Sequence, residues 1–204
     1  MPDGWTFVIA PSGARAEKTG GARDRYNRLS SATACLLALW NAHKAFAAPS
    51  LGAALVARGN GAADELHALI DAETPDGWDP AALHRRLTHF VREDARVVDA
   101  AAAFAAADGA ALGALSADSQ EDAHRLLGNQ VDETRALVAS ARGLGAIGAC
   151  SFGAGFGGSV WAVVERDRAR DFAHEWDSAA FAVRPSPPLT EFRVEAGTVS
   201  YNGQ

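Results

Sequence analysis

The sequence is poor in cysteine and in positive charge, and it contains no long apolar run. Two cysteines, Cys35 and Cys150, are too few for a disulfide framework in a chain of 204 residues. The formal net charge is −6, and its basic residues are mixed with acidic ones, so the chain lacks the basic face that neutralises nucleic-acid phosphates. The most apolar stretch, residues 100–107, is too short to span a bilayer. With no signal-peptide pattern at its start, we expect a cytoplasmic protein that binds neither nucleic acid nor membranes.

Hydrophobic residues make up 48% of the chain, which is enough to bury a core. A short strand is expected at residues 7–10, and the "PSG" that follows is a turn signal. Asp79 followed by Pro80 predicts the start of a long helix that ends at Asp108. Its expected apolar face consists of Leu83, Leu87, Phe90, Val91, Val97, Val98 and Phe104. The charges in "RRLTHFVRED" on the same helix are typical of a solvated face.

Helices dominate the middle of the chain and strands its two ends. Helices are expected at residues 26–46, 111–127 (with a break near Ser116), 131–144 and 167–177, with one or two short ones between residues 47 and 79. Strands are expected at residues 147–152 and 159–165, and two closing strands at residues 180–185 and 190–200. This order favours an α+β fold over repeated βαβ units.

A cluster of four glycines, Gly153, Gly155, Gly157 and Gly158, stands between two of these strands. Its spacing fits G-x-G-x-x-G, but the β-branched and aromatic residues after it predict a strand where a dinucleotide site needs a helix. No Lys-Ser or Lys-Thr follows the glycines, which excludes a P-loop. Two interpretations remain open for this strand–loop–strand hairpin: an anion-binding nest of backbone amides, or close packing against a neighbouring helix without any ligand.

Other chemically capable residues favour structural roles. His84 and His89 are five residues apart on a helix and therefore face different directions, so no metal site is expected. Cys150 has no histidine nearby in sequence and is interpreted as a small strand residue rather than a nucleophile.

The stretch "GACSFGAGFGGSVWAVVE" resembles the third signature of the galactokinase branch of the GHMP sugar kinases. "WTFVIAPSGARAEKTGGARDRYNRLSSATA" is similar to that family's mid-chain strand, loop and "YNxR" helix start, and "LHRRLTHFVREDARVVDAAAAFAAADGAALGAL" resembles its "RxxHvxxEnxRV" helices. The resemblance covers almost the whole chain and only the second half of a family member. It implies a GHMP-kinase C-terminal-like domain, an antiparallel sheet packed with several helices. Residues 1–204 would form this single portion, residues 1–22 being a strand and loop that enter from a missing N-terminal half and residues 23–204 the domain itself.

The family phosphorylates a monosaccharide such as galactose with ATP and Mg²⁺. The resemblance therefore implies the C-terminal part of a galactokinase-like phosphotransferase that is incomplete without an N-terminal half, and a separately encoded half is a candidate partner. Its substrate-binding residues would be Tyr26, Gly153, Gly155, Gly157 and Gly158. No catalytic residue, metal ligand or ligand for ATP or Mg²⁺ is identified in this chain.

Several positions depart from the family pattern. Cys150 stands where many members have a basic residue, Phe152 replaces a hydroxyl residue, and Gln120 replaces a histidine, whereas Ser119 and Glu133 are kept. These departures leave a second function open, a non-catalytic sugar-sensing or interaction module derived from a galactokinase. The sequence does not identify the sugar, the catalytic base or the oligomeric state.

Overall fold

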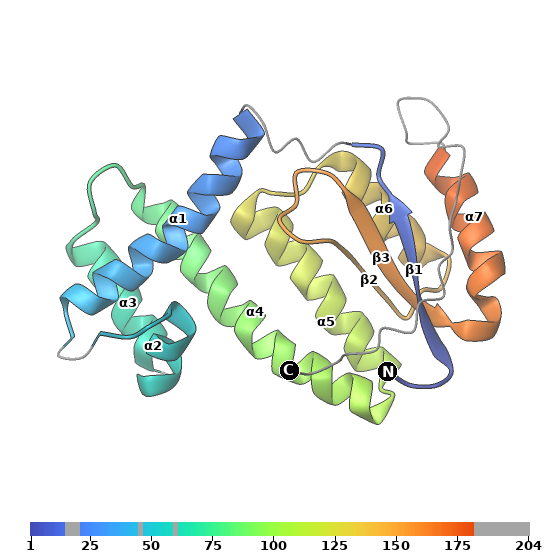
Figure 1. The fold of residues 1–204 in the computed structure, drawn as a ribbon, viewed down its shortest axis with the longest axis horizontal. Helices are drawn as coiled ribbons and strands as arrows, with labels where there is room; N and C mark the ends of the chain where they lie inside the picture. Colours follow the sequence, from blue (N-terminus) through green and yellow to red (C-terminus); the bar gives the residue numbers. More distant parts are fainter. Residues whose placement is uncertain (15–20, 45–46, 59–60, 182–204) are drawn as a thin grey trace, which may run out of the picture. The chain divides into compact units, whose positions relative to one another are not determined.

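The computed structural model describes residues 1–14, 21–44, 47–58 and 61–181, which belong to two compact units (Figure 1). Unit 1 comprises Met1–Arg15, Ala103–Ala117 and Gln130–Gln204. Unit 2 comprises Ala16–Ala102 and Asp118–Asn129.

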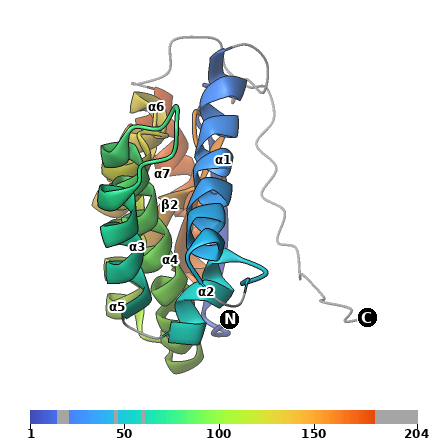
Figure 2. The same ribbon diagram turned by 90° about the vertical axis from the view of Figure 1, so that its left-hand side faces the viewer.

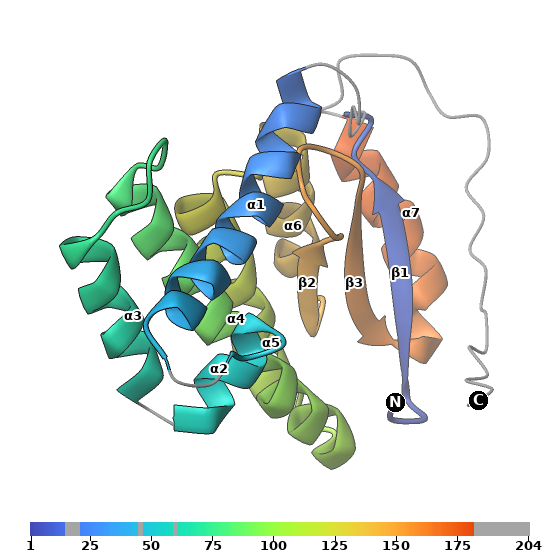
Figure 3. The ribbon, with the colours of Figure 1, turned by 60° about the vertical axis from the view of Figure 1, so that its left-hand side comes forward.

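Unit 1 is built on a three-stranded antiparallel sheet of order β1-β3-β2 (Figure 3). Its strands are β1 (Trp5–Pro11), β2 (Gly148–Ser151) and β3 (Ser159–Glu165). The central strand β3 pairs along its length with β1, from Trp5 opposite Glu165 to Pro11 opposite Ser159. Its β-branched and apolar residues, buried in part on both faces, are what a central strand requires.

Both faces of this sheet carry helical cover. Helices α6 (Asp132–Gly143) and α7 (Ala169–Phe181), the latter preceded by the 3₁₀ turn η2 (Arg166–Arg168), pack on one face. Trp176 of α7 is 1% exposed there, and its indole Nε1 donates to the carbonyl of Leu137 at 3.1 Å. On the other face, Leu112 of α5 (Gly109–Asp122) packs with Trp5 and Val163.

Unit 2 is helical (Figure 2). Helices α1 (Gly21–Ala42), α2 (Leu51–Arg58), α3 (Gly61–Ala72) and the first part of α4 (Pro80–Ala106) share one apolar core. Leu36, Leu66, Ile70, Leu83 and Leu87 are fully buried in it. The π-helical turn η1 (Ala123–Leu127) continues α5 and belongs to the same unit.

The α+β fold class predicted from the sequence is confirmed. The predicted start of α4 is also confirmed, because both carboxylate oxygens of Asp79 accept hydrogen bonds, from the amides of Ala81 at 3.1 Å and Ala82 at 3.2 Å. The closing strand expected at residues 180–185 is wrong at its start, because residues 180 and 181 belong to helix α7 (Ala169–Phe181). The rest of that strand and the one expected at residues 190–200 lie outside the described residues. Among the helices that the structure describes, none combines the length and apolar character needed to cross a membrane.

Three further expectations were wrong. Val97 and Val98 are 69% and 70% exposed, so the apolar face of α4 does not continue through them. The expected break near Ser116 does not occur, because α5 runs from Gly109 to Asp122 and the Ser116 hydroxyl donates to the Gly113 carbonyl within the helix. The first helix begins at Gly21, five residues before the expected start.

Candidate functional site

The glycine-rich segment is the loop that joins β2 to β3. Cys150 lies opposite Trp161 and Ser151 opposite Val160, and the amide of Phe152 donates to the carbonyl of Ser159 at 2.9 Å. The predicted strand–loop–strand hairpin is therefore confirmed, with β3 beginning at the residue directly after the last glycine.

The backbone of this loop lies largely in the left-handed region. Positive φ angles occur at Gly153 (59°), Gly155 (76°), Phe156 (60°), Gly157 (120°) and Gly158 (91°). Glycine adopts these angles without the Cβ clash of other residues, which explains the composition of the segment. Phe156 adopts a positive φ with a bulky side chain, and such strain is concentrated at functional sites in proteins.

Close packing against a helix does not account for the two outer glycines of the loop. A Cβ built on Gly153 or Gly158 would meet no atom within 4 Å. Two glycines elsewhere in unit 1 differ in this respect: a Cβ on Gly113 would lie 2.6 Å from the carbonyl oxygen of Ile147, and one on Gly148 would lie 2.9 Å from the Ser116 hydroxyl. The space beside Gly153 and Gly158 is thus open to a ligand.

Two of the departures from the family pattern, Cys150 and Phe152, lie at or beside this loop. Cys150 is 7% exposed within β2, as expected of a small strand residue. Phe152 begins the loop and is 46% exposed. The loop therefore presents an aromatic ring where a hydroxyl would be expected from the resemblance.

Tyr26, the other predicted substrate-binding residue, lies in the second turn of α1 and is 50% exposed. It belongs to unit 2, whereas the loop belongs to unit 1. A joint contact of Tyr26 and the glycines with one substrate stays a prediction.

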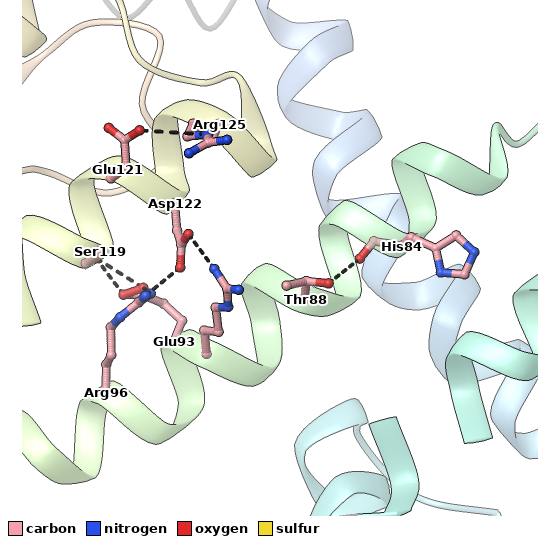
Figure 4. A network of polar contacts seen from close by, with 9 residues as sticks. His84, Thr88, Glu93, Arg96, Ser119, Glu121, Asp122 and Arg125 are labelled. Carbon is pink, nitrogen blue, oxygen red and sulfur yellow. Dashed lines mark hydrogen bonds and ion pairs between the residues drawn. The ribbon is translucent and has the colours of Figure 1, made fainter. Parts of the chain in front are cut away.

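The charged stretch of α4 is solvated in part, as predicted for Arg85, Arg92 and Asp94, which are exposed. Glu93 is only partly exposed, and Figure 4 shows its contacts together with those of Arg96 beyond the stretch. The carboxylate of Glu93 accepts from the hydroxyl of Ser119 at 2.6 Å, and Arg96 donates to Asp122 at 2.5 Å. Arg92 donates to the second oxygen of Asp122 at 2.9 Å. Asp122 is 7% exposed, so these paired charges fasten α4 to the end of α5 within unit 2.

This network lowers the pKa of Asp122. Burial alone would raise it, but the hydrogen bond and the charge of Arg96, together with Arg92, outweigh burial. Ser119, one of the two residues kept from the family pattern in its region, thus has a structural partner. Within the described part of the chain, no group of three or more His, Cys, Asp or Glu side chains could hold a metal ion.

Two histidines of unit 2 have lowered pKa values. Burial, followed by the charge of His84, lowers the pKa of His67, whose Nδ1 lies 2.6 Å from the Nδ1 of His84. Burial, followed by the charge of Arg86, lowers the pKa of His89, whose Nδ1 lies 3.1 Å from an Arg86 Nη. Both rings therefore favour the neutral form in the fold.

We expect the stability of unit 2 to fall as the pH is lowered from 7.5 to 5.5. In this window His67 and His89 become protonated in the unfolded state but stay neutral in the folded state, because their pKa values are lower there. The unfolded state therefore binds more protons, and a lower pH stabilises it relative to the folded state. Urea unfolding at both pH values measures the difference. The double variant His67→Gln/His89→Gln should flatten the dependence, whereas His174→Gln, at an exposed position of α7, should leave it unchanged. An equal slope in the double variant and the wild type would contradict this assignment.

Comparison with known proteins relates this loop and its surroundings to one family. Residues 100–183, which include the loop, match the model of the family described as "GHMP kinases C terminal". The crystal structure of Lactococcus lactis galactokinase complexed with galactose superposes with a TM-score of 0.66 at 25% sequence identity, over 88% of this chain and 42% of that chain. The family match and the structural similarity support the interpretation of this chain as a galactokinase-like, GHMP kinase C-terminal portion.

Curated relatives point the same way. The galactokinase of Mycobacterium tuberculosis is 42% identical over 89 residues, which cover 44% of this chain and 24% of that protein. The galactokinase of Thermococcus kodakarensis is 33% identical over 117 residues, which cover 52% of this chain and 33% of that protein. The chain thus spans between a quarter and a third of the curated galactokinases that it matches. The GHMP C-terminal α+β fold inferred from the resemblance is confirmed.

Proposed function

We propose that this chain supplies one wall of a galactokinase-type active site, in which a phosphoryl group passes from ATP to a hydroxyl of a monosaccharide such as galactose. The observation that carries the proposal is the glycine loop, with positive φ at five of its six positions and open space at Gly153 and Gly158. The similarity to GHMP kinase C-terminal domains and to galactokinases supports the choice of chemistry.

The loop suits phosphoryl transfer for a physical reason. This reaction relies on positioning and on donors that stabilise negative charge, more than on covalent chemistry by the protein. Consecutive backbone amides in a loop of this kind can form a concave nest for an anion. Gly153 and Gly158 have open space where another residue would carry a Cβ, so sugar or phosphate oxygens can approach the backbone there without meeting side chains.

Tyr26 is the proposed second contact with the sugar. Tyr26 is half exposed near the start of α1, so a ligand can reach its side chain. This role comes from the "YNxR" resemblance, and substitution of Tyr26 by Phe would show whether the hydroxyl contributes.

ATP and Mg²⁺ are the co-substrate and ion of the proposed reaction. Mg²⁺ prefers carboxylate, phosphate and water oxygens, and the described residues offer no cluster of three acidic or metal-ligating side chains. Because the resemblance covers only the second half of a family member, we assign the phosphate-binding loop, the Mg²⁺ ligand and the base to an N-terminal kinase half, as a partner of this chain.

The first test is binding of D-galactose to the purified chain by isothermal titration calorimetry. We expect a Kd of about 1 mM or tighter, and at least about a tenfold loss in the Gly158→Ala variant. Alanine at φ +91° strains the backbone and turns the loop away from its present path, although the new methyl group meets no neighbour.

Gly145→Ala is the matched control. Gly145 has φ +88°, lies in the same unit and is separated from the loop by β2, so its substitution imposes similar strain. It should lower the melting temperature to a similar degree and leave galactose affinity unchanged. The proposed sugar site would be overturned if titration of the wild type with galactose showed no heat of binding, or if both variants lost the same affinity.

Turnover decides between a kinase portion and a sugar-sensing module. The replacement of the expected basic and hydroxyl residues by Cys150 and Phe152 favours the module, whereas the retained glycines favour the kinase. We expect no phosphorylation of any hexose by the chain alone with ATP and Mg²⁺. If adding an N-terminal galactokinase half produces sugar phosphate, the kinase assignment holds; if sugar still binds without turnover, the sensing module replaces it.

A further inference from the structure

The short segment that follows β1 is attached to the glycine loop. It consists of Ser12, Gly13 and Ala14, and Gly13 turns the chain with φ +79°. Ser12 is 1% exposed, which is unusual for a serine in a turn at the end of a strand. A buried hydroxyl requires hydrogen-bond partners, and the structure shows two for Ser12, the amide and the carbonyl of Ala14.

Two backbone hydrogen bonds join this segment to the last glycine of the loop. The amide of Ser12 donates to the carbonyl of Gly158 at 2.8 Å, and the amide of Gly158 donates to the carbonyl of Ala14 at 2.9 Å. Both polar groups of Gly158 are therefore held by the segment after β1. This fixes the point where the loop enters β3.

The side chain of Ser12 closes the segment on itself. Its Oγ accepts a hydrogen bond from the amide of Ala14 at 3.2 Å and lies 3.4 Å from the Ala14 carbonyl oxygen. The hydroxyl thereby holds the Ala14 carbonyl in the position where it receives the amide of Gly158. Without the hydroxyl, Gly13 would let Ala14 move, because glycine does not restrict the turn.

We propose that Ser12 is a positioning residue of the glycine-loop site. It sets the path of Gly158, and through Gly158 the orientation of the neighbouring amides of the loop, without touching the substrate. A loop in which four of six residues are glycine has little intrinsic preference for one conformation, so it needs such an external restraint to present its amides in a fixed arrangement. The inference rests on the proposed function in assigning a sugar or phosphate ligand to that arrangement.

Ser12→Ala tests this role, and Ser116→Ala is its matched control. Ser116 is a serine of unit 1 that is also buried, at 5% exposure, and its hydroxyl donates to the Gly113 carbonyl within α5. Both variants remove one buried hydroxyl that bonds to a nearby backbone group. A purely structural role of Ser12 predicts the same behaviour in both.

The first readout is hydrogen exchange at single amides of the full chain, which does not depend on any ligand. We expect the exchange rates of the Ser12 and Gly158 amides to rise at least tenfold in Ser12→Ala and to stay unchanged in Ser116→Ala. Unchanged protection of Gly158 in Ser12→Ala would overturn the proposal, whatever the protein binds.

The second readout is galactose affinity by calorimetry, compared at equal fractions of folded protein. We expect Ser12→Ala to weaken binding about fivefold or more while Ser116→Ala binds like the wild type. If Gly158 loses protection and affinity is unchanged, Ser12 holds the loop but does not position the site, and the proposal fails. If the wild type itself binds no galactose, the proposed function is wrong, and so is the positioning role of Ser12 in a sugar site. The exchange result would still show whether Ser12 holds the loop.

Discussion

Replacement of Gly113 by alanine is expected to destabilise unit 1 by about 2–3 kcal/mol. The new Cβ would lie 2.6 Å from the carbonyl oxygen of Ile147, closer than any carbon atom approaches an oxygen without displacement. Because that oxygen belongs to the backbone at the entry to β2, it cannot swing away as a flexible side chain would. Either α5 must move off the sheet or the turn before β2 must shift, and both loosen the core around Leu112 and Val163.

Gly143→Ala provides the control for this prediction. Gly143 is the last residue of α6 in the same unit, and a Cβ there would meet nothing within 4 Å. Alanine has the higher helix propensity, so this variant should match the wild type or gain up to about 1 kcal/mol. Chemical denaturation followed by far-UV circular dichroism gives both values. Equal stability of Gly113→Ala and the wild type would mean that α5 does not pack on the Ile147 turn as the structure describes.

The contrast between these glycines shows what sequence reasoning can and cannot reach. The composition of residues 153–158 and the β-branched run after it were enough to predict a hairpin, because both signals are local. The same reasoning assigned no role to Gly113, which looks like any small residue in an alanine-rich helix. Its importance comes from Ile147, 34 residues away in the chain, and nothing in the local pattern encodes that approach.

The same limit explains the incorrect face of α4. Leu83 and Leu87 were placed correctly, because the helical period is sufficient where one face meets a core. Further along the helix, the face toward the end of α5 is occupied by Glu93 and Arg96, and the sequence pattern placed Glu93 on a solvated face. Paired charges can be buried where both partners are present, and the partners Ser119 and Asp122 lie 26 residues on in each case.

The residues of the candidate site also divide into those that the sequence could indicate and those that it could not. The glycines were identified from their signature, and the strand after them removed the dinucleotide alternative. Ser12 was passed over as part of a turn signal, because its burial depends on strand pairing between segments separated by more than 140 residues. A serine beside a glycine at the end of a predicted strand was the sequence clue that was available.

Replacement of Asp122 by alanine is the second change with a large expected effect, a loss of about 2–4 kcal/mol in the stability of unit 2. The side chains of Asp122 and Arg96 are only 10% and 14% exposed, so the change would leave a guanidinium group largely withdrawn from water with Glu93 as its remaining acidic partner. The lowered pKa of Asp122 means that the carboxylate stays ionised through neutral pH and the pairing is present there.

The neighbouring residue supplies the control for this change. Glu121 forms an ion pair with Arg125 one helical turn later, but these side chains are 60% and 73% exposed. Solvent screens such a pair, so Glu121→Ala should cost no more than about 0.5 kcal/mol. Urea unfolding of the two variants at pH 7 compares removal of the same kind of charge from adjacent positions. If both variants lose equally little, the Arg92–Asp122–Arg96 contacts do not hold α4 to the end of α5; if only Asp122→Ala loses stability, burial rather than charge count decides the strength of this network.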